Sequence, residues 1–153
     1  MKITLFTANQ FRHNYLINLL SGVSKELYVV QENDTLYPGE VQGHYPSSDI
    51  YKNYFSNVLK AQEKLFGKDY ITAKNLKLLS LKEGDINKCS MSFLKDFLKS
   101  DIYIVTGSSF IKGELANFLI EKKALSIHMG LAPYYRGTDC NFWALFDNNP
   151  HLV

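Results

Sequence analysis

The alternation of short apolar, β-prone runs with helical segments limits the fold of this chain more than any other feature of its sequence. Residues 3–7 and 27–30 are two such runs, each rich in side chains that favour strands. The segment between them carries apolar side chains at helical spacing, namely Phe11, Tyr15, Leu16, Leu19 and Leu20. A strand, a helix and a second strand within about thirty residues match the size of one βαβ unit.

The middle of the chain continues this alternation after a long polar stretch. Residues 32–48 contain two prolines and two glycines, so we expect a long loop there, and such loops are usually functional or mobile. A helix is expected over residues 49–66 and a strand over 76–81, followed by a turn at 84–87. The apolar spacing of residues 92–98 predicts a further short helix.

The run DIYIV at residues 101–105 carries consecutive apolar side chains, which is typical of a strand buried on both faces of a parallel sheet. A short helix over 113–121, a strand over 125–128 and a final helical segment over 140–146 are expected to follow. We therefore predict an α/β fold, a Rossmann-like three-layer arrangement whose largely parallel sheet carries helices on both faces. Its strands are expected near residues 2–7, 26–31, 76–81, 101–106 and 124–128.

Composition and charge exclude several functional classes. We found no linker or repeat, so residues 1–153 are expected to form one domain. The formal net charge of +2 gives no electrostatic reason to expect a DNA partner. Cys89 and Cys140 lack the spacing of a metal site or a disulfide framework, so no metal is expected and free thiols fit a cytoplasmic location. No signal peptide or membrane-spanning run is evident, so no membrane partner is expected.

Ligands of open parallel α/β sheets bind beyond the carboxyl ends of the strands. Residues 7–9, residues 106–109 and the segment that begins at His128 each follow an expected strand. The chain has no GxGxxG sequence and no P-loop, which argues against a dinucleotide or a nucleoside triphosphate held by its phosphates. We expect the ligand site where these segments converge.

Residues 126–137 hold the densest group of chemically useful residues. A histidine at a strand end, such as His128, can occupy a partly dry site in which its pKa shifts. Gly130 permits a sharp backbone course or the close approach of a ligand, Pro133 stiffens the loop, and Gly137 lets the chain turn. Taken alone, a histidine of this kind is more often a hydrogen-bonded strand-end residue than a catalytic group.

The stretch SIHMGLAPYYRGTDCNFWAL at residues 126–145 resembles the motif of the formyltransferase family. That motif runs Asn-x-His, a small residue, Leu-x-Pro and often Tyr-Arg-Gly. The family includes the methionyl-tRNA, glycinamide ribonucleotide and amino-sugar formyltransferases, and this stretch looks most like the sugar type. The resemblance implies transfer of a formyl group from 10-formyltetrahydrofolate to a primary amine. It also implies that this chain corresponds to the amino-terminal part of the family's catalytic domain.

By this resemblance His128 is the catalytic histidine. A protonated imidazole would stabilise the developing oxyanion, and a neutral one would assist proton transfer. Ser126 stands where the family has asparagine, and it offers a single hydroxyl donor in place of an amide group. The alternative for Ser126 is a small strand-end residue with no part in the chemistry.

The same resemblance implies that the pterin ring of the folate binds in a cleft between residues 107–111 and 128–133. Backbone amides of the first loop would hold the polar edge of the pterin, and Phe110 or Ile111 would cover its flat face. The implied cofactor-binding residues are Gly107, Ser108, Ser109, Phe110, Ile111, Gly130, Leu131 and Pro133. The alternative is an ordinary β–α turn in which Phe110 and Ile111 belong to the core.

Arg12 and Arg136 are the two arginines among the 17 Lys and Arg residues. In a lysine-rich chain, arginine tends to appear where a planar and permanently charged group is needed. Arg136 is expected either to hold a phosphate or carboxylate of the substrate or to brace its loop by pairing with an acid. Asn9 and Arg12 are candidates for meeting a substrate anion at a helix amino terminus, although a solvated helix start is the preferred interpretation.

The remaining aromatic and imidazole candidates receive structural roles. Trp143 is expected in the core rather than as a stacking platform for a ligand. His13, His44 and His151 are expected to be exposed to solvent.

Formyltransferases carry a catalytic aspartate a few tens of residues beyond the histidine, after a Gly-x-Thr-x-His stretch. Since this chain stops at Val153, we expect an incomplete domain, truncated at its C-terminal side and weakly active or inactive alone. The expected partner is a small-molecule amine acceptor, a nucleotide-linked amino sugar in first place and methionyl-tRNA in second. A folate- or nucleotide-binding module without turnover is the non-enzymatic alternative. An oligomer is allowed by the sequence but not required by it.

Overall fold

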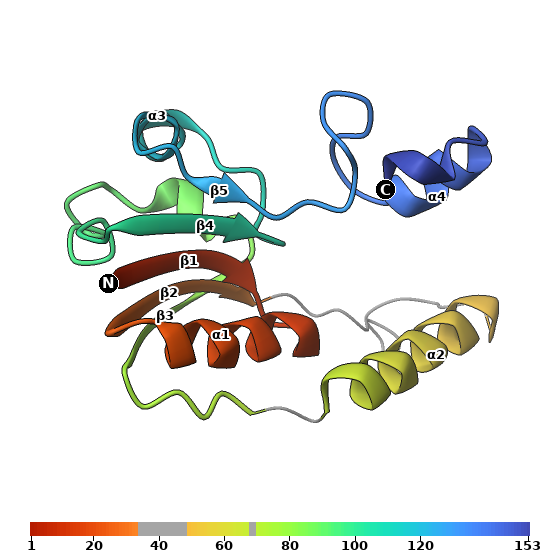
Figure 1. The fold of residues 1–153 in the computed structure, drawn as a ribbon, viewed down its shortest axis with the longest axis horizontal. Coiled ribbons are helices and arrows are strands. Elements are labelled where there is room, and N and C mark those ends of the chain that lie inside the picture. The colour runs from red at the N-terminus through yellow and green to blue at the C-terminus, as the bar shows by residue number, and fades with distance from the viewer. Residues whose placement is uncertain (34–48, 68–69) are drawn as a thin grey trace.

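The computed structural model describes residues 1–33, 49–67 and 70–153. Five parallel strands form one sheet in the order β3-β2-β1-β4-β5 (Figure 1). The strands are β1 (Lys2–Ala8), β2 (Glu26–Asn33), β3 (Leu76–Lys82), β4 (Ile102–Thr106) and β5 (Leu125–Ser126). This arrangement confirms the predicted α/β fold with a parallel sheet.

The sheet separates two apolar clusters because successive strand residues point to opposite faces. Leu5 lies opposite Val29 on β2 and Ile104 on β4, and all three belong to the cluster that includes Ile17 of helix α1 (Phe11–Val23). Phe6, the next residue of β1, packs into the other cluster with side chains of helix α3 (Gly113–Glu121). Helices therefore cover both faces of the sheet, as the three-layer prediction requires.

The remaining helices and turns complete the layers. Helix α2 (Asp49–Phe66) agrees with the predicted helix and contacts α1, where the Tyr15 and Phe66 rings lie 5.6 Å apart. The predicted turn at 84–87 is a short 3-10 helix, η2 (Asp85–Lys88). Helix α4 (Cys140–Phe146) and the 3-10 helix η3 (Pro150–Leu152) follow the sheet and project away from it (Figure 1).

The predicted helix over residues 92–98 is wrong, because this segment forms a run of turns. Side chains of the sheet hold the end of this segment through its carbonyl groups. The Thr4 hydroxyl donates to the Phe97 carbonyl oxygen at 2.6 Å, and the Tyr103 hydroxyl donates to that of Leu98 at 2.7 Å. Leu94 is nevertheless fully buried, so its apolar position was predicted correctly while the backbone conformation was not.

The strand expected over 124–128 is reduced to Leu125–Ser126, because β5 is an edge strand that pairs with β4 alone, although the Ile127 amide still donates to the Val105 carbonyl oxygen. His128 therefore lies beyond the strand. Most of the long loop expected over 32–48 falls at 34–48, outside the described residues. In the described part of the chain, no helix combines the length and hydropathy needed to cross a membrane.

Candidate functional site

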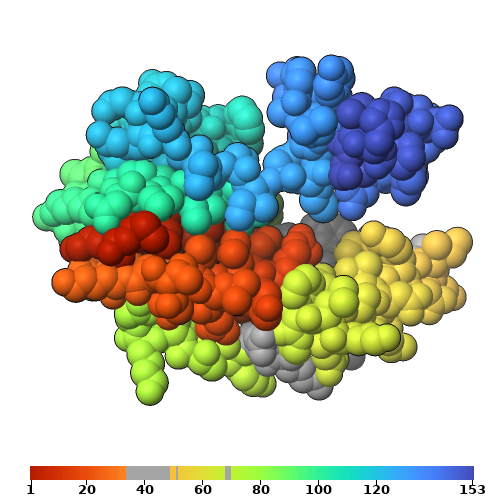
Figure 2. Space-filling model, in the orientation of Figure 1, coloured from red at the N-terminus to blue at the C-terminus, as the bar shows by residue number. Residues whose placement is uncertain are grey.

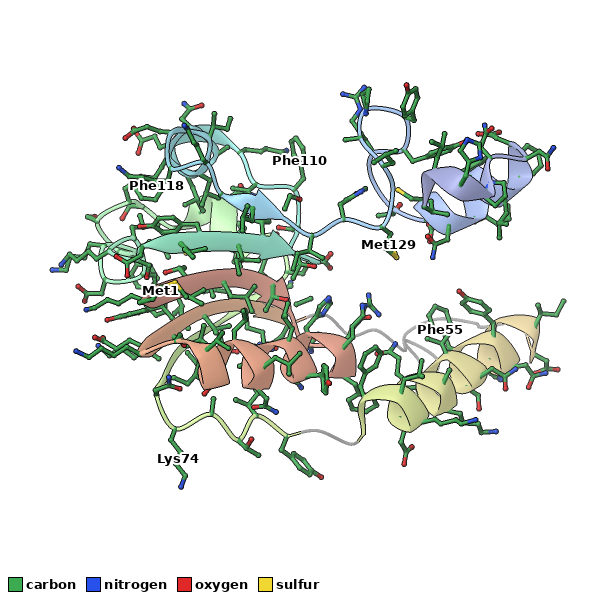
Figure 3. The ribbon with its side chains drawn as sticks, in the orientation of Figure 1. Met1, Phe55, Lys74, Phe110, Phe118 and Met129 are labelled. Atoms are coloured by element: carbon green, nitrogen blue, oxygen red, sulfur yellow. The ribbon has the colours of Figure 1, made fainter. Side chains whose placement is uncertain are left out.

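The strand order places a topological switch point between β1 and β4, the neighbours from which the chain runs outward in opposite directions. Ligands of doubly wound α/β folds bind near the carboxyl ends of strands at such a point. Figure 3 shows Phe110 projecting from the loop between β4 and α3, and Met129 projecting from the chain that follows β5. Both belong to segments that leave the carboxyl ends of their strands.

A cleft of about 750 Å³ lies at this end of β5. In the space-filling view, the surface is notched between α3 and the C-terminal segment (Figure 2). The cleft brings together six residues that the sequence had singled out, Phe110, Ser126, His128, Gly130, Leu131 and Arg136. Its remaining lining residues are Met129, Ala132, His151, Leu152 and Val153. Of the other candidates, Gly107, Ser108, Ser109, Ile111, Pro133, Asn9 and Arg12 do not line it.

His128 is held by the backbone of its own loop. Its Nδ1 lies 3.1 Å from the Gly130 amide nitrogen, and its Nε2 lies 3.1 Å from the Gly137 carbonyl oxygen. A neutral imidazole that accepts at Nδ1 and donates from Nε2 satisfies both contacts. The Gly130 carbonyl oxygen lies 3.0 Å from Nδ1 and can accept a hydrogen bond from Nδ1–H when the ring is charged. Any chemistry at Nε2 therefore requires its release from Gly137.

Gly130 is required by the packing of the loop on itself. A Cβ atom at this position would lie 2.5 Å from the Tyr135 carbonyl oxygen and 2.8 Å from the Cys140 sulfur. The Leu131 amide donates to the Leu152 carbonyl oxygen at 2.8 Å, which ties the end of the chain to the same loop. The close approach that the sequence suggested at Gly130 is thus an approach of the chain's own backbone, at one wall of the cleft.

Only Phe110 of the predicted pterin loop reaches the cleft. Its side chain is 80% exposed, so the alternative that placed it in the core is wrong for this residue. The same alternative is correct for Ile111, which packs against the cluster that contains Phe6. The Ser109 amide donates to Glu32 Oε2 at 2.7 Å, so it has no free N–H to offer the polar edge of a ligand.

Glu32 is a residue that sequence reasoning missed. Its carboxylate is 2% exposed and joins two loops, because Oε1 accepts from the Gly84 amide at 2.8 Å and from the Ser109 hydroxyl at 3.0 Å. A buried carboxylate is tolerated only when it is hydrogen-bonded in this way. The available signal was its place at the carboxyl end of the apolar run of β2. Glu32 fixes the loop that presents Phe110.

His13 is the second residue that was missed, and its predicted exposure is wrong. The side chain is 4% exposed, its Nδ1 accepts from the Gln10 amide at 3.3 Å, and its Nε2 would lie 2.4 Å from a Cβ on Gly107. Burial, together with the nearby positive charge of Arg12, lowers the pKa of His13 to about 4. His13 is therefore neutral near pH 7 and packs under the start of α1, with Ile17 one turn later.

The predicted core position of Trp143 is also wrong. Its side chain is 50% exposed and lies edge-on to Phe142 and Phe146, with ring centroids 5.1 and 5.9 Å away. The buried side of α4 is made by Cys140 and Ala144, one turn apart, so the small residues pack and the aromatic ones face outward. His151 is exposed, as predicted, and His44 lies outside the described residues.

The two interpretations of Arg136 can be compared with its surroundings. Among the described residues, no acidic side chain forms an ion pair with Arg136. The bracing role therefore lacks its acid, and Arg136 lines the cleft instead. Asn9 and Arg12 lie next to and within the first turn of α1, away from the cleft lining. Across residues 1–33, 49–67 and 70–153, no group of His, Cys, Asp or Glu could hold a metal ion.

Comparison with known proteins identifies the fold. No family model matches the sequence, and no curated protein is significantly similar to it. Among solved structures, the crystal structure of phosphoribosylglycinamide formyltransferase from Anaplasma phagocytophilum superposes with a TM-score of 0.51 at 14% sequence identity. The match covers 96% of this chain and 58% of that structure, so this chain spans little more than half of its length. At this identity the likeness shows a common fold, and that fold is similar to a formyltransferase's.

Proposed function

We propose that this chain belongs to an enzyme that transfers a formyl group from 10-formyltetrahydrofolate to a primary amine, with a nucleotide-linked amino sugar as the acceptor. The observation that carries the proposal is the cleft at the carboxyl end of β5, which gathers His128, Phe110 and Arg136. The likeness of the fold to a formyltransferase supports the reaction type. The sugar acceptor rests on the sequence motif of residues 126–145 alone.

The lining of the cleft fits a flat, mainly apolar ring such as the pterin of a reduced folate. Its volume of about 750 Å³ lies in the range of small-molecule sites. Phe110 offers an exposed aromatic ring, and Met129 and Leu131, both more than half exposed, offer further apolar surface. When bound there, 10-formyltetrahydrofolate would supply the formyl carbon that the amine attacks.

His128 is the residue of this chain that can act on the developing charge. Its Nε2–H can be directed at the formyl oxygen once it leaves the Gly137 carbonyl oxygen, 3.1 Å away. A donor fixed on that oxygen lowers the barrier because negative charge grows there during attack. The Gly130 amide and carbonyl at Nδ1 keep the ring oriented in both protonation states. Ser126, at the end of β5, adds a hydroxyl donor to the same cleft.

One observation favours a second candidate function. Both ring nitrogens of His128 are bonded to backbone groups, which is the arrangement of a structural histidine. A module that binds a folate or a nucleotide without turnover needs no more than the cleft. The two candidates differ in whether His128 must leave Gly137 for the chain to work.

The proposal is tested in a full-length version of the enzyme, by formyl transfer from 10-formyltetrahydrofolate to a nucleotide-linked amino sugar, with and without His128→Ala. The variant should lower turnover by at least about 100-fold, the low end for losing a positioned acid–base group. Binding of the amine should change much less, because the imidazole acts mainly in the transition state. Leu145→Ala, 66% exposed and outside the cleft, serves as the control. Unchanged turnover in His128→Ala would return this histidine to a structural role.

Calorimetry with a non-reactive formyl-folate analogue tests the carrier site in the same preparation. Phe110→Asp should abolish binding because it removes the exposed ring at the cleft wall. Tyr134→Asp makes the same kind of change at a residue that is 68% exposed and outside the lining, and it should bind normally. Tight binding by Phe110→Asp would mean that the pterin site lies elsewhere. Binding by the wild type with no transfer to any amine would favour the module.

A further inference from the structure

The cleft contains a basic residue that the proposed function leaves without a role, His151. Arg136 and His151 both line it, and they approach from different parts of the chain. We propose that these two side chains form an anion-binding subsite that holds a phosphate or carboxylate group of the ligand. The proposal rests on the proposed function for the identity of that ligand, but the subsite itself is a separate claim.

The position of His151 is fixed by backbone hydrogen bonds. It lies in η3, whose Leu152 carbonyl oxygen accepts from the Leu131 amide at 2.8 Å. The Asn149 amide donates to the Ala144 carbonyl oxygen at 2.7 Å, so η3 is also joined to the end of α4. The Asn149 side chain donates to the Tyr135 hydroxyl at 3.2 Å. These contacts hold η3 against the loop that carries His128 and Arg136.

The lining side chains of the cleft carry no negative charge. Its lining residues include a guanidinium and two imidazoles, and none of them has a carboxylate side chain. Within the described residues, Arg136 has no acidic partner. A guanidinium carries its charge at every physiological pH, and its planar fork matches phosphate and carboxylate oxygens. An arginine without an acidic partner in a cleft that has no carboxylate side chain therefore favours an anionic ligand.

Of the two imidazoles, that of His128 is already hydrogen-bonded within the protein, whereas that of His151 can bind a ligand. His128 uses both ring nitrogens on Gly130 and Gly137. His151 has no hydrogen-bond partner among the described residues, and it is exposed at the cleft. Its ring carries at least one N–H, so it can donate to an anion in either protonation state. His151 thus supplies the directed donor and Arg136 the permanent charge.

Two parts of the proposed reactants carry the required anion. One is the diphosphate of a nucleotide-linked sugar, and the other is the glutamate carboxylate of the folate. Both present oxygen atoms that accept from a guanidinium fork and an imidazole N–H. The shared chemistry is what the subsite recognises, and the probes below separate the two sources.

Binding of inorganic pyrophosphate is the direct test, measured by calorimetry at fixed ionic strength. Arg136→Gln should weaken it by about 10-fold or more, the value of a charge-assisted hydrogen bond, and His151→Gln by about 3- to 10-fold. Lys95→Gln removes one positive charge from an exposed surface away from the cleft, and it should change affinity less than about 2-fold, since isolated surface charges act weakly at moderate salt. Circular dichroism checks that each variant is folded.

Either of two results refutes the anion subsite. Pyrophosphate affinity that is absent in the wild type, or unchanged in the Arg136→Gln, His151→Gln double variant, refutes it. Pyrophosphate binding in a protein that transfers no formyl group leaves the subsite standing while the proposed function fails. Uridine diphosphate, a glutamate-bearing reduced folate and the same folate without glutamate then separate the sources. Arg136→Gln should weaken either the nucleotide or the glutamate-bearing folate, and equal loss for the glutamate-free folate would contradict an anion subsite.

Discussion

The central strands of the sheet bury their apolar side chains, whereas the C-terminal segment, residues 127–153, leaves many of its own exposed. Leu5 and Val29 in the sheet are fully buried, whereas Leu145 and Phe146 in α4 are 66% and 72% exposed. Both regions are rich in apolar residues, so composition does not separate them. The difference is that the central strands β1 and β2 are covered on both faces, while α4 buries only a small face of Cys140 and Ala144.

The two regions therefore owe their shapes to different forces. The central strands are stabilised by removal of apolar surface from water, which acts on the whole fold. The C-terminal segment is shaped by local hydrogen bonds, among them those from the Leu131 amide to Leu152 and from the Tyr135 hydroxyl to Asp147. Changes in the sheet should alter global stability, and changes in the segment should alter the cleft.

The largest expected effect is a pair of identical substitutions, one in each region. Leu5→Ala leaves a cavity at a fully buried position and should lower the free energy of unfolding by about 2–5 kcal/mol. Leu145→Ala removes the same atoms from an exposed site and should change it by less than about 0.5 kcal/mol. Urea unfolding followed by circular dichroism measures both. Similar losses in the two variants would show that α4 is covered in solution and would end the comparison.

Acidic pH should lower the free energy of unfolding by a smaller amount, through protonation of His13 beside the sheet. The pKa of His13 is about 4 in the fold and about 6.5 when unfolded, so the unfolded chain binds more protons between these pH values. The free energy of unfolding should therefore be unaffected by His13 above pH 6.5 and should fall by up to about 3 kcal/mol as the pH drops to 4.

Stability curves between pH 4 and 8 measure this loss. His13→Asn should remove its share of the pH dependence, since the variant has no group that titrates there. A wild-type slope in His13→Asn would assign the acid sensitivity to other groups.

The smallest of the three expected effects on stability is confined to the C-terminal segment. Gly130→Ala places a Cβ 2.5 Å from the Tyr135 carbonyl oxygen, so the loop must shift, at a cost of about 1–3 kcal/mol typical of overpacking. Hydrogen exchange should rise in residues 128–137 and stay unchanged in β1. Gly22→Ala is the matched control, because a Cβ there meets no atom within 4 Å. Uniformly faster exchange in the sheet would mean that the two regions are coupled.

The sequence indicated some of the residues that lie together but not the contacts that hold them. Residues such as Phe110, His128 and Arg136 do line one cleft, because all three follow strands whose carboxyl ends share an edge of the sheet. The sequence did not reveal that Glu32 takes the Ser109 amide, since these residues lie 77 positions apart. The sequence also did not predict that His151 lines the cleft, because η3 is brought back to this loop by a tertiary contact, the hydrogen bond from the Leu131 amide to the Leu152 carbonyl oxygen.

By itself, the sequence determined the layers of this protein. The apolar runs of β1, β2 and β4 and the periodic stripes between them leave few ways to bury their side chains, and a parallel α/β sheet is one that fits all of them. Tertiary structure alone decided the backbone of residues 92–98, the burial of His13 and the exposure of Trp143. Each of these depends on what a distant segment offers: hydroxyl donors from the sheet, space beside Gly107, and no covering layer over α4 among the described residues. Periodicity reports which side chains favour burial, but the partner that buries them comes from elsewhere in the chain.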